Sequence, residues 1–164
     1  MKIRQATIND ADQLMNLISH VESTSDYMLM EPGERNNSID QQTKMIKHFN
    51  QQEKSAIFVA DNGALLGYLI VIGNSSLRNK HSANLVIGVH AEARGQGIGR
   101  QLFEAVEHWA KSVHISRLEL TVVTENEAAI RLYKNCGFEI EGTKRHSLLI
   151  QDKYFDEYYM SKLL

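Results

Sequence analysis

The sequence predicts a mixed α/β (α+β) domain built on a central β-sheet, and three observations support this prediction. Some stretches alternate apolar and polar residues, as strands do, and others repeat apolar residues every three or four positions, as amphipathic helices do. These stretches occur in the order β-α-α-β-β-β-α-β-α-β-β. The chain has 164 residues, of which 43% are hydrophobic, and this suits one domain over 1–164 with a sizeable core.

The first half of the sequence predicts a strand, two helices and a hairpin. KIRQA alternates like a strand, and Asp10 is suited to open a helix. The apolar face of that helix is formed by Leu14, Leu17, Ile18 and Val21. A loop with the only proline, Pro32, follows, and the apolar spacing over 39–49 indicates a second helix. AIFVADNGALLGYLIVIG predicts two strands joined by a turn at 61–63.

The second half predicts three more strands and two more helices. A β-branched run indicates a strand over 84–90, and RLELTVV indicates another over 117–123. The helix between them has an apolar face formed by Ile98, Leu102, Val106, Trp109 and Val113. Thr124 and Glu127 fit a capping box that opens the last helix. The segment 138–164 then predicts two final strands.

Composition and charge exclude several classes of protein. The 18 basic and 20 acidic residues give a net charge of −2, so no overall field attracts nucleic acid or anionic lipid. The single cysteine excludes an internal disulfide. The N-terminus lacks the apolar core of a signal peptide, and no apolar run reaches the roughly 18 residues of a membrane span. We therefore expect a cytoplasmic protein without nucleic-acid or membrane partners.

The segment ARGQGIGR (93–100) lies between a predicted strand and a predicted helix. Its glycines lack Cβ atoms, so main-chain N–H groups can approach a ligand closely. The helix start adds unpaired N–H groups and a positive dipole end, which together suit a phosphate. Arg94 and Arg100 would add charge and forked hydrogen bonds. The alternative is a glycine-rich turn that only eases a tight connection.

Two well-known phosphate loops do not match this segment. A P-loop ends in Gly-Lys-Ser/Thr, whereas here Arg100 and Gln101 follow the last glycine. The dinucleotide fingerprint needs G-x-G-x-x-G, whereas the spacing here is G-x-G-x-G. The loop also lies in the middle of the chain rather than in a first βαβ unit.

Two longer segments resemble the GNAT superfamily of N-acetyltransferases. VIGVHAEARGQGIGRQLFEAVEHWA is similar to the acyl-CoA-binding segment of that family, in which Arg/Gln-x-x-Gly-x-Gly/Ala opens a helix after an apolar strand. NEAAIRLYKNCGFEIEG is similar to the second signature of the family. The order of elements also agrees over the chain. The resemblance implies the GNAT fold, with helices around a mixed sheet that splays between its fourth and fifth strands.

The resemblance further implies acetyl-CoA as cosubstrate and no metal. The cofactor-binding residues it assigns are Ile87, Val89, Arg94, Gly95, Gln96, Gly97, Ile98, Gly99, Arg100 and Asn126. The pyrophosphate would lie on the glycine loop, and the pantetheine arm would pair with the edge of the 84–90 strand. A backbone N–H near Val89 would stabilise negative charge on the thioester oxygen.

The resemblance assigns the catalytic acid to Tyr133, whose phenol would donate a proton to the CoA sulfur. The alternative for Tyr133 is packing in the core, and Asn126 equally suits a helix cap. Many relatives carry a glutamate on the strand before the loop, but HSANLVIGVH contains no acid. The base stays open between His81, His146, a water chain and no dedicated base.

The acceptor side is expected in the loop after the first helix and in the late strands. Met30 would line an apolar pocket, Glu31 would bind an ammonium, and Arg35 would pair with a substrate carboxylate; the alternative is a solvated loop. The C-terminal part resembles a bacterial subgroup that acetylates small amines or free amino acids. We therefore expect direct attack by a small primary amine in a ternary complex.

Three alternatives to a small acceptor remain open at this point. The acceptor could be a polyamine, or the N-terminus or a lysine of a protein. The fold could also serve as a non-catalytic acyl-CoA-binding module. Exposed sheet edges leave room for a homodimer.

Overall fold

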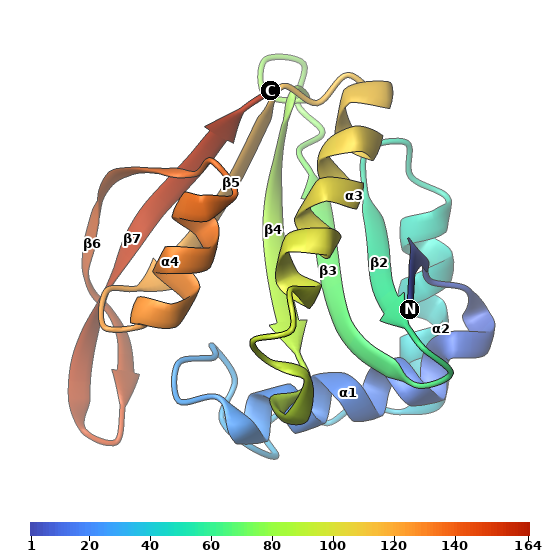
Figure 1. Cartoon of the computed structure of the whole chain (residues 1–164), viewed down its shortest axis with the longest axis horizontal. Coiled ribbons are helices and arrows are strands. Elements are labelled where there is room, and N and C mark those ends of the chain that lie inside the picture. The colour runs from blue at the N-terminus through green and yellow to red at the C-terminus, as the bar shows by residue number, and fades with distance from the viewer.

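The computed structural model describes residues 1–164, and its elements follow the predicted order (Figure 1). The strands are β1 (Lys2–Gln5), β2 (Ala56–Asp61), β3 (Leu65–Gly73), β4 (Ser82–Val89), β5 (Arg117–Val123), β6 (Glu139–Ile150) and β7 (Lys153–Leu163). The helices are α1 (Ala11–Thr24), α2 (Ile39–Asn50), α3 (Ile98–Ser112) and α4 (Glu127–Asn135). Short 3₁₀ turns at Ile8–Asp10 and Ala91–Ala93 precede α1 and α3. The predicted mixed α/β class is confirmed.

All seven strands form one sheet, in the order β1-β2-β3-β4-β5-β7-β6. Every neighbouring pair is antiparallel except β4 and β5, which run parallel. Only three residue pairs join β4 to β5, from Ser82 with Arg117 to Asn84 with Glu119. Beyond them β5 stays paired with β7 while it turns away from β4 (Figure 1). The predicted splay between the fourth and fifth strands is confirmed.

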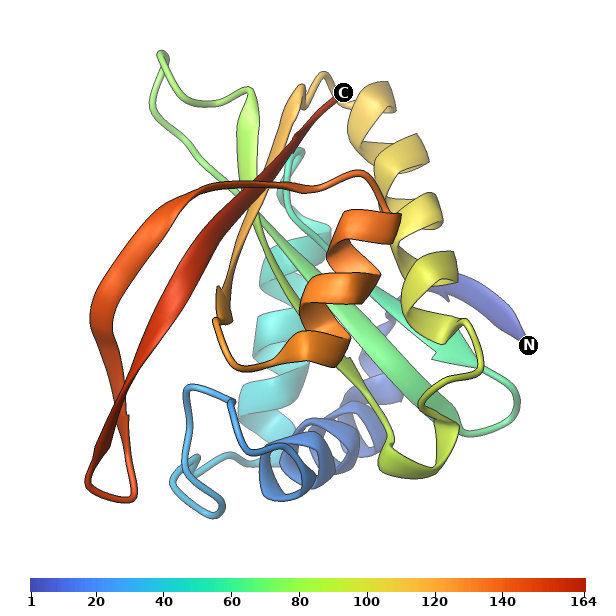
Figure 2. The ribbon, with the colours of Figure 1, turned by 60° about the vertical axis from the view of Figure 1, so that its left-hand side comes forward.

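Helices cover both faces of the sheet (Figures 1 and 2). The core under α3 and α4 includes Phe58, Leu69, Leu102, Phe103, Tyr133 and Phe138. The core under α1 and α2 includes Leu14, Ile18, Ile46, Val59 and Tyr68. Successive strand residues point to opposite faces, so Phe58 enters the first core and Val59 enters the second.

Side chains fix both ends of the loop at 25–38, which connects α1 to α2. At its far end Ser38 and Gln41 form a capping box: the Ser38 hydroxyl accepts the Gln41 N–H at 3.2 Å, and the Gln41 side chain accepts the Ser38 N–H at 3.1 Å. At its near end the Thr24 hydroxyl and carbonyl both accept from the Arg94 guanidinium. The loop lies beside the β6–β7 hairpin in both views (Figures 1 and 2).

None of the helices combines the length and the apolar character that a membrane span requires.

Candidate active site

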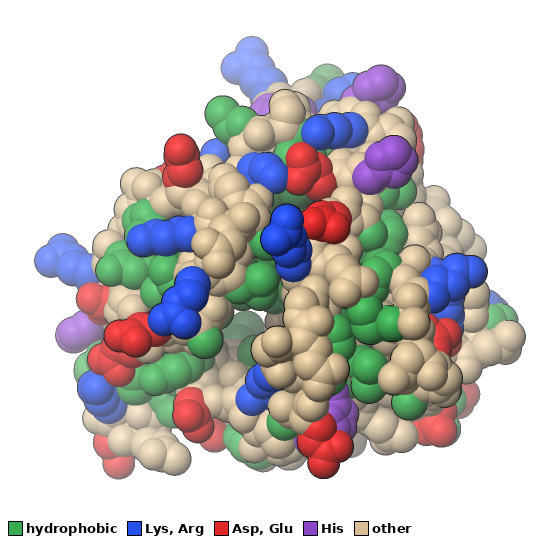
Figure 3. Space-filling model, in the orientation of Figure 1, with side chains coloured by type: hydrophobic (Ala, Val, Ile, Leu, Met, Phe, Trp, Pro, Cys, Tyr) green, Lys and Arg blue, Asp and Glu red, His purple; other side chains and the backbone are tan.

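The splay creates a wedge between β4 and β5, and the candidate active site is built around it. The space-filling view shows a hollow between the surface over α4 and the surface over α3, with hydrophobic side chains on its walls (Figure 3). A strand that loses its neighbour exposes main-chain groups along one edge. The free half of β4, residues 85–89, therefore borders the wedge with hydrogen-bonding groups.

The β3–β4 ladder decides which groups of β4 face the wedge. The His90 N–H donates to the Leu66 carbonyl at 2.8 Å, next to the pair formed by Gly67 and Val89. Antiparallel ladders alternate between hydrogen-bonded and non-hydrogen-bonded pairs, so Ile87 and Val89 occupy the non-bonded type toward β3. Their main-chain N–H and C=O groups point away from β3 and toward the gap. The Val89 carbonyl accepts from Arg94 Nε at 3.3 Å, whereas the Val89 N–H points toward the gap and has no strand partner there.

The glycine loop presents a row of free amides. The first main-chain bond of α3 runs from the Gln101 N–H to the Gly97 carbonyl at 3.1 Å, and the N–H groups of residues 95–100 donate no hydrogen bond. Gly95 and Gly97 have φ values of 76° and 79°, in the left-handed region that only glycine adopts readily. These two glycines therefore shape a concave main-chain surface suited to an anion.

Gly99 has a different reason to lack a side chain. It lies in the first turn of α3 and is buried, and a Cβ there would approach Leu132 Cδ2 of α4 to 2.7 Å. The glycine thus lets α4 pack closely against α3. Ile98, beside it, is 2% exposed in the core under the same helices. The segment consequently joins the free amides to the helix that carries Tyr133.

The two arginines of the loop make contacts within the protein. Arg94 donates to the Thr24 carbonyl, the Thr24 hydroxyl and the Val89 carbonyl, at 3.2 to 3.3 Å. Arg100 forms an exposed ion pair with Glu104, one turn along α3, at 3.0 Å. The structure therefore gives Arg94 a bracing role between α1 and β4, whereas the Arg100 pair contributes little to stability. Gln96 is exposed and donates to the Glu92 carbonyl at 3.2 Å.

Tyr133 lies on the other side of the wedge, on the buried face of α4. Its ring packs against Phe103 and Phe138, with centroid distances of 5.7 Å and 6.2 Å. No hydrogen bond within the chain uses its hydroxyl, although only 8% of the residue is exposed. Burial raises the pKa of Tyr133 to about 12, and the nearby Cys136 thiol acts in the same direction. The phenol therefore stays protonated at neutral pH and can donate.

The start of α4 differs from the predicted capping box. Asn126 is the N-cap, and its side-chain carbonyl accepts the Ala129 N–H at 3.3 Å. The box between Thr124 and Glu127 was a wrong prediction, because the Thr124 N–H still pairs with the Asp156 carbonyl of β7. Sheet pairing thus continues through Thr124 and delays the helix. The amide NH₂ of Asn126 has no partner and remains available to a ligand.

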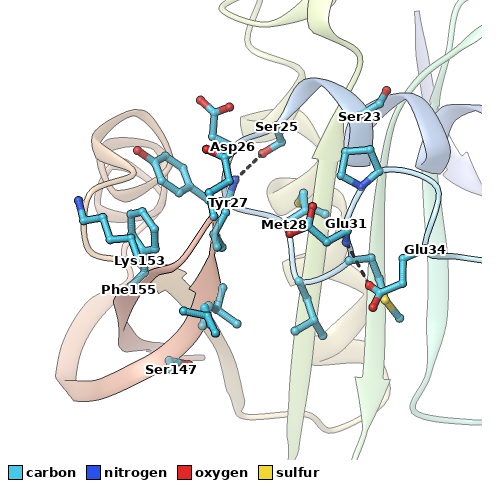
Figure 4. A pocket seen from close by; sticks show the side chains of 17 residues that line it. Ser23, Ser25, Asp26, Tyr27, Met28, Glu31, Glu34, Ser147, Lys153 and Phe155 are labelled. Atoms are coloured by element: carbon cyan, nitrogen blue, oxygen red, sulfur yellow. Dashed lines mark hydrogen bonds between the residues drawn. The ribbon is translucent and has the colours of Figure 1, made fainter.

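A cavity of about 750 Å³ lies between the loop at 25–38 and the β6–β7 hairpin (Figure 4). Met28, Met30 and Phe155 give it an apolar wall, and Tyr27 packs edge-on against Phe155 at 5.8 Å. Carboxylates line it from the loop side: Asp26, Glu31 and Glu34. The Glu34 carboxylate accepts the Glu31 N–H at 3.1 Å, as the dashed line in Figure 4 marks.

Arg35 does not line this cavity, contrary to expectation. Its Nε instead donates to the Glu22 carboxylate of α1 at 2.9 Å. The cation in the wall is Lys153, which already contacts Glu125 at 3.3 Å and lies 4.8 Å above the Phe155 ring. A substrate carboxylate would therefore find both neighbouring cations engaged.

The predicted candidate bases lie outside this arrangement. His81 is exposed, and His146 is exposed and stacks on Tyr154 with a centroid distance of 4.4 Å. Two buried residues were not predicted from the sequence: Glu22 of α1, and Tyr68 of β3, whose phenol lies against Gly88 of β4. Neither belongs to a motif, and only the apolar face of α1 marked the helix that carries Glu22. No group of three or more His, Cys, Asp or Glu side chains is arranged to hold a metal ion.

The model of the acetyltransferase (GNAT) family matches residues 21–138. This region contains the free half of β4, the glycine loop and Tyr133, so the match covers the wedge described above. The chain belongs to the GNAT acetyltransferase family. The resemblance predicted from the two motifs is confirmed.

Curated relatives carry acetyltransferase names. The L-amino acid N-acetyltransferase AaaT of Escherichia coli K12 is 33% identical over 106 residues, which cover 62% of this chain and 64% of that protein. Spermidine N(1)-acetyltransferase of the same strain is 25% identical over 109 residues, covering 66% and 58%. The alignments thus span less than two thirds of the length of these two relatives. The uncharacterized N-acetyltransferase YoaA of Bacillus subtilis is 31% identical over 151 residues, covering 87% and 81%.

Solved structures have the same fold over nearly the whole chain. A GNAT-family acetyltransferase from Streptococcus pneumoniae superposes with a TM-score of 0.95 at 27% identity, covering 99% of both chains. The yncA protein of Salmonella typhimurium, solved with acetyl-CoA, superposes with a TM-score of 0.87 at 19% identity, covering 99% of this chain and 93% of that one. The predicted GNAT fold is confirmed.

Proposed function

We propose that this protein transfers an acetyl group from acetyl-CoA to a primary amine of a small molecule, by direct attack in a ternary complex. The observation that supports the proposal most is the row of free amides at 95–100 beside the open edge of β4. An anionic ligand with a peptide-like arm explains the free amides and the open strand edge together. We assign this activity to a single domain formed by 1–164.

The residues present fit the two ends of the cofactor. The free amides of the loop match the phosphate oxygens of the diphosphate, and the edge groups of Ile87 and Val89 match the amides of pantetheine. The unpartnered amide NH₂ of Asn126 supplies a further donor from the α4 side of the wedge. Acetyl-CoA supplies an activated acyl carbon and a thiolate leaving group.

Two groups of the chain would then assist the transfer. The free Val89 N–H lies at the edge of the wedge and stabilises negative charge that develops on the thioester oxygen. Tyr133, a phenol that is protonated at neutral pH, donates its proton to the departing sulfur. Both are in place before substrates bind, and such preorganisation lowers the barrier.

The cavity beside the loop favours an amine as the acceptor. Its three carboxylates attract an ammonium, while Met28, Met30 and Phe155 accept an apolar substituent. Lys153 and Arg35 are already paired, so a free carboxylate gains less there. The names of relatives that act on L-amino acids and on spermidine support an acceptor of small size.

The proposal is tested by incubating the purified full chain with acetyl-CoA and pairs of amines, and following thiol release. The pairs differ only in a carboxylate, as phenethylamine and L-phenylalanine do, and spermidine and a short lysine peptide complete the panel. We expect turnover of small amines, with a lower KM for the partner that lacks the carboxylate. Tight acetyl-CoA binding without turnover of any amine would instead support a non-catalytic acyl-CoA-binding module.

A further inference from the structure

Glu22 is a buried carboxylate that uses only half of its hydrogen-bonding capacity. The residue is 4% exposed on the inner face of α1. Its Oε1 accepts from Arg35 Nε at 2.9 Å, whereas its Oε2 has no partner at all. A buried carboxylate oxygen without a donor is unfavourable, so Oε2 is suited to receive one from a ligand.

Contacts on both sides of Glu22 dock the last turn of α1 against the end of β4. Two residues earlier, His20 Nε2 accepts the Ala91 N–H at 3.2 Å. Two residues later, Thr24 accepts from Arg94, which also holds the Val89 carbonyl. These contacts hold the last turn of α1 against the end of β4, and Glu22 lies on the opposite side of that turn, toward Arg35.

Tyr68 connects Glu22 to the strand. A Cβ at Gly88 would lie 2.6 Å from the Tyr68 hydroxyl oxygen, so the phenol occupies the place of a residue 88 side chain. Burial raises the pKa of Tyr68 above its ordinary value; the Glu22 carboxylate and Tyr133 act in the same direction, and Arg35 opposes them. Tyr68 is therefore near enough to both Glu22 and Tyr133 to be influenced by each of them.

This geometry supplies the acid that β4 itself lacks. On the face of β4 covered by α1, the strand has a glycine at 88, whose side-chain space is filled by Tyr68, and the Glu22 carboxylate of α1 acts on that phenol. The loop that carries Arg35 over Glu22 also forms the acidic and apolar wall of the acceptor cavity. Glu22 does not line the cavity itself, and Arg35 links its carboxylate to the loop that forms this wall.

We infer that the free Oε2 of Glu22 accepts a hydrogen bond from the acceptor amine and takes up the proton that the amine loses on acetylation. The inference rests on the proposed acetyltransferase function. The amine nitrogen forms a C–N bond to the acetyl carbon and the C–S bond breaks. One proton passes from nitrogen to Glu22, and one passes from Tyr133 to sulfur. Glu22 then releases its proton to solvent, and Tyr133 regains one from solvent.

The test compares Glu22→Gln with the wild-type chain, using the amine of the panel that the wild type acetylates fastest. The amide keeps an oxygen for Arg35 but cannot take up a proton, so we expect kcat/KM for the amine to fall about 100-fold. The dissociation constant for acetyl-CoA should stay within about twofold, which shows that the variant folds. Asp12→Asn, an exposed carboxylate on the same helix, serves as the control and should behave as wild type.

Glu22→Asp distinguishes proton transfer from packing. It shortens the side chain but keeps a carboxylate, so it should recover activity above the level of Glu22→Gln. If Glu22→Gln keeps wild-type kcat/KM, or if Glu22→Asp is no better than Glu22→Gln, the role of Glu22 is refuted while the proposed function stands. If the wild type acetylates no amine of the panel, the proposed function and this inference fail together.

Discussion

The proposed cofactor side and the proposed acceptor side of the site are built in different ways. The cofactor side, residues 85–100, is one continuous segment whose useful groups are main-chain amides. The acceptor side is the loop at 25–38 with the β6–β7 hairpin, and there the useful groups are side chains. Its key pair, Glu22 with Arg35, joins a helix to a loop, and Phe155 comes from the far end of the chain.

The difference explains why one kind of site can be predicted from the sequence and the other cannot. A main-chain site needs a local conformation, and glycines at positive φ are enough to signal it. A side-chain site needs tertiary placement, because a glutamate on a helix looks the same whether it faces solvent or a substrate. The cofactor side is therefore open to prediction from motifs, and the acceptor side is not.

The largest expected effect tests whether the cofactor side depends on main-chain geometry. Gly97→Val puts a β-branched residue at a φ of 79°, which should distort the row of amides. We expect acetyl-CoA affinity to fall about 100-fold or more, measured by calorimetry, since strain and lost hydrogen bonds add. Gly63→Val is the matched control: its φ of 105° imposes comparable strain in the β2–β3 turn, away from the loop. Equal acetyl-CoA affinity in the two variants would show that cofactor binding does not depend on the main-chain geometry of the loop.

The next effect concerns Tyr133, the side chain of α4 that lies beside the proposed cofactor site. Tyr133→Phe keeps the ring packed against Phe103 and Phe138 but removes the hydroxyl. We expect kcat to fall about tenfold or more, with little change in acetyl-CoA affinity. Steady-state kinetics with Tyr159→Phe, an exposed tyrosine of β7, provides the control. An unchanged kcat across the pH range would remove Tyr133 as the acid.

The fold itself could be predicted because its apolar patterns are local and consistent. The boundary errors arise where polar residues take buried or paired positions. The strand expected over 84–90 begins at Ser82, whose hydroxyl is buried and bonds with Asn74 and Asn79. Apolar periodicity does not predict a buried serine whose hydroxyl is hydrogen-bonded within a turn.

The acceptor residues predicted from the sequence stay predictions, and the structure shows where their side chains lie. The cavity does take Met30 and Glu31 into its wall, since composition alone marks a loop rich in methionine and acid. Arg35 was expected to meet a substrate, yet the structure pairs it with Glu22. That partner lies on another element, and its burial follows only from the packing of α1 on the sheet.

A smaller effect compares two glycines that allow close approach. A Cβ at Gly88 would meet the buried ring of Tyr68 at 2.6 Å, and a Cβ at Gly99 would meet the flexible end of Leu132 at 2.7 Å. We expect Gly88→Ala to cost about 1–3 kcal/mol, as overpacking does, because the ring cannot move freely. Gly99→Ala should cost less, since the half-buried leucine can change rotamer. Denaturant unfolding of both variants measures the loss of unfolding free energy. A larger loss for Gly99→Ala would show that the Tyr68 ring moves easily.

The smallest effect lies where α1, which leads into the acceptor loop, contacts the end of β4. The rings of His20, from α1, and His90, at the end of β4, stack at 3.8 Å. Each ring accepts a main-chain N–H: His20 Nε2 from Ala91, and His90 Nδ1 from Glu92. A protonated nitrogen cannot accept, so acid should loosen the contact between α1 and the segment that leads to the glycine loop.

The sign follows from the pKa of His20, which is lowered below its ordinary 6.5, first by burial and then by His90 and Arg94. The unfolded chain then binds more protons than the folded one, so stability is full above about pH 6.5 and is lost as the pH falls through the folded pKa. His20→Gln offers a carbonyl acceptor that does not titrate, so its melting temperature should fall less in acid. His108→Gln, an exposed histidine of α3, should retain the wild-type profile. Identical profiles for all three chains would mean that the two sides are joined by Arg94 and Thr24 alone.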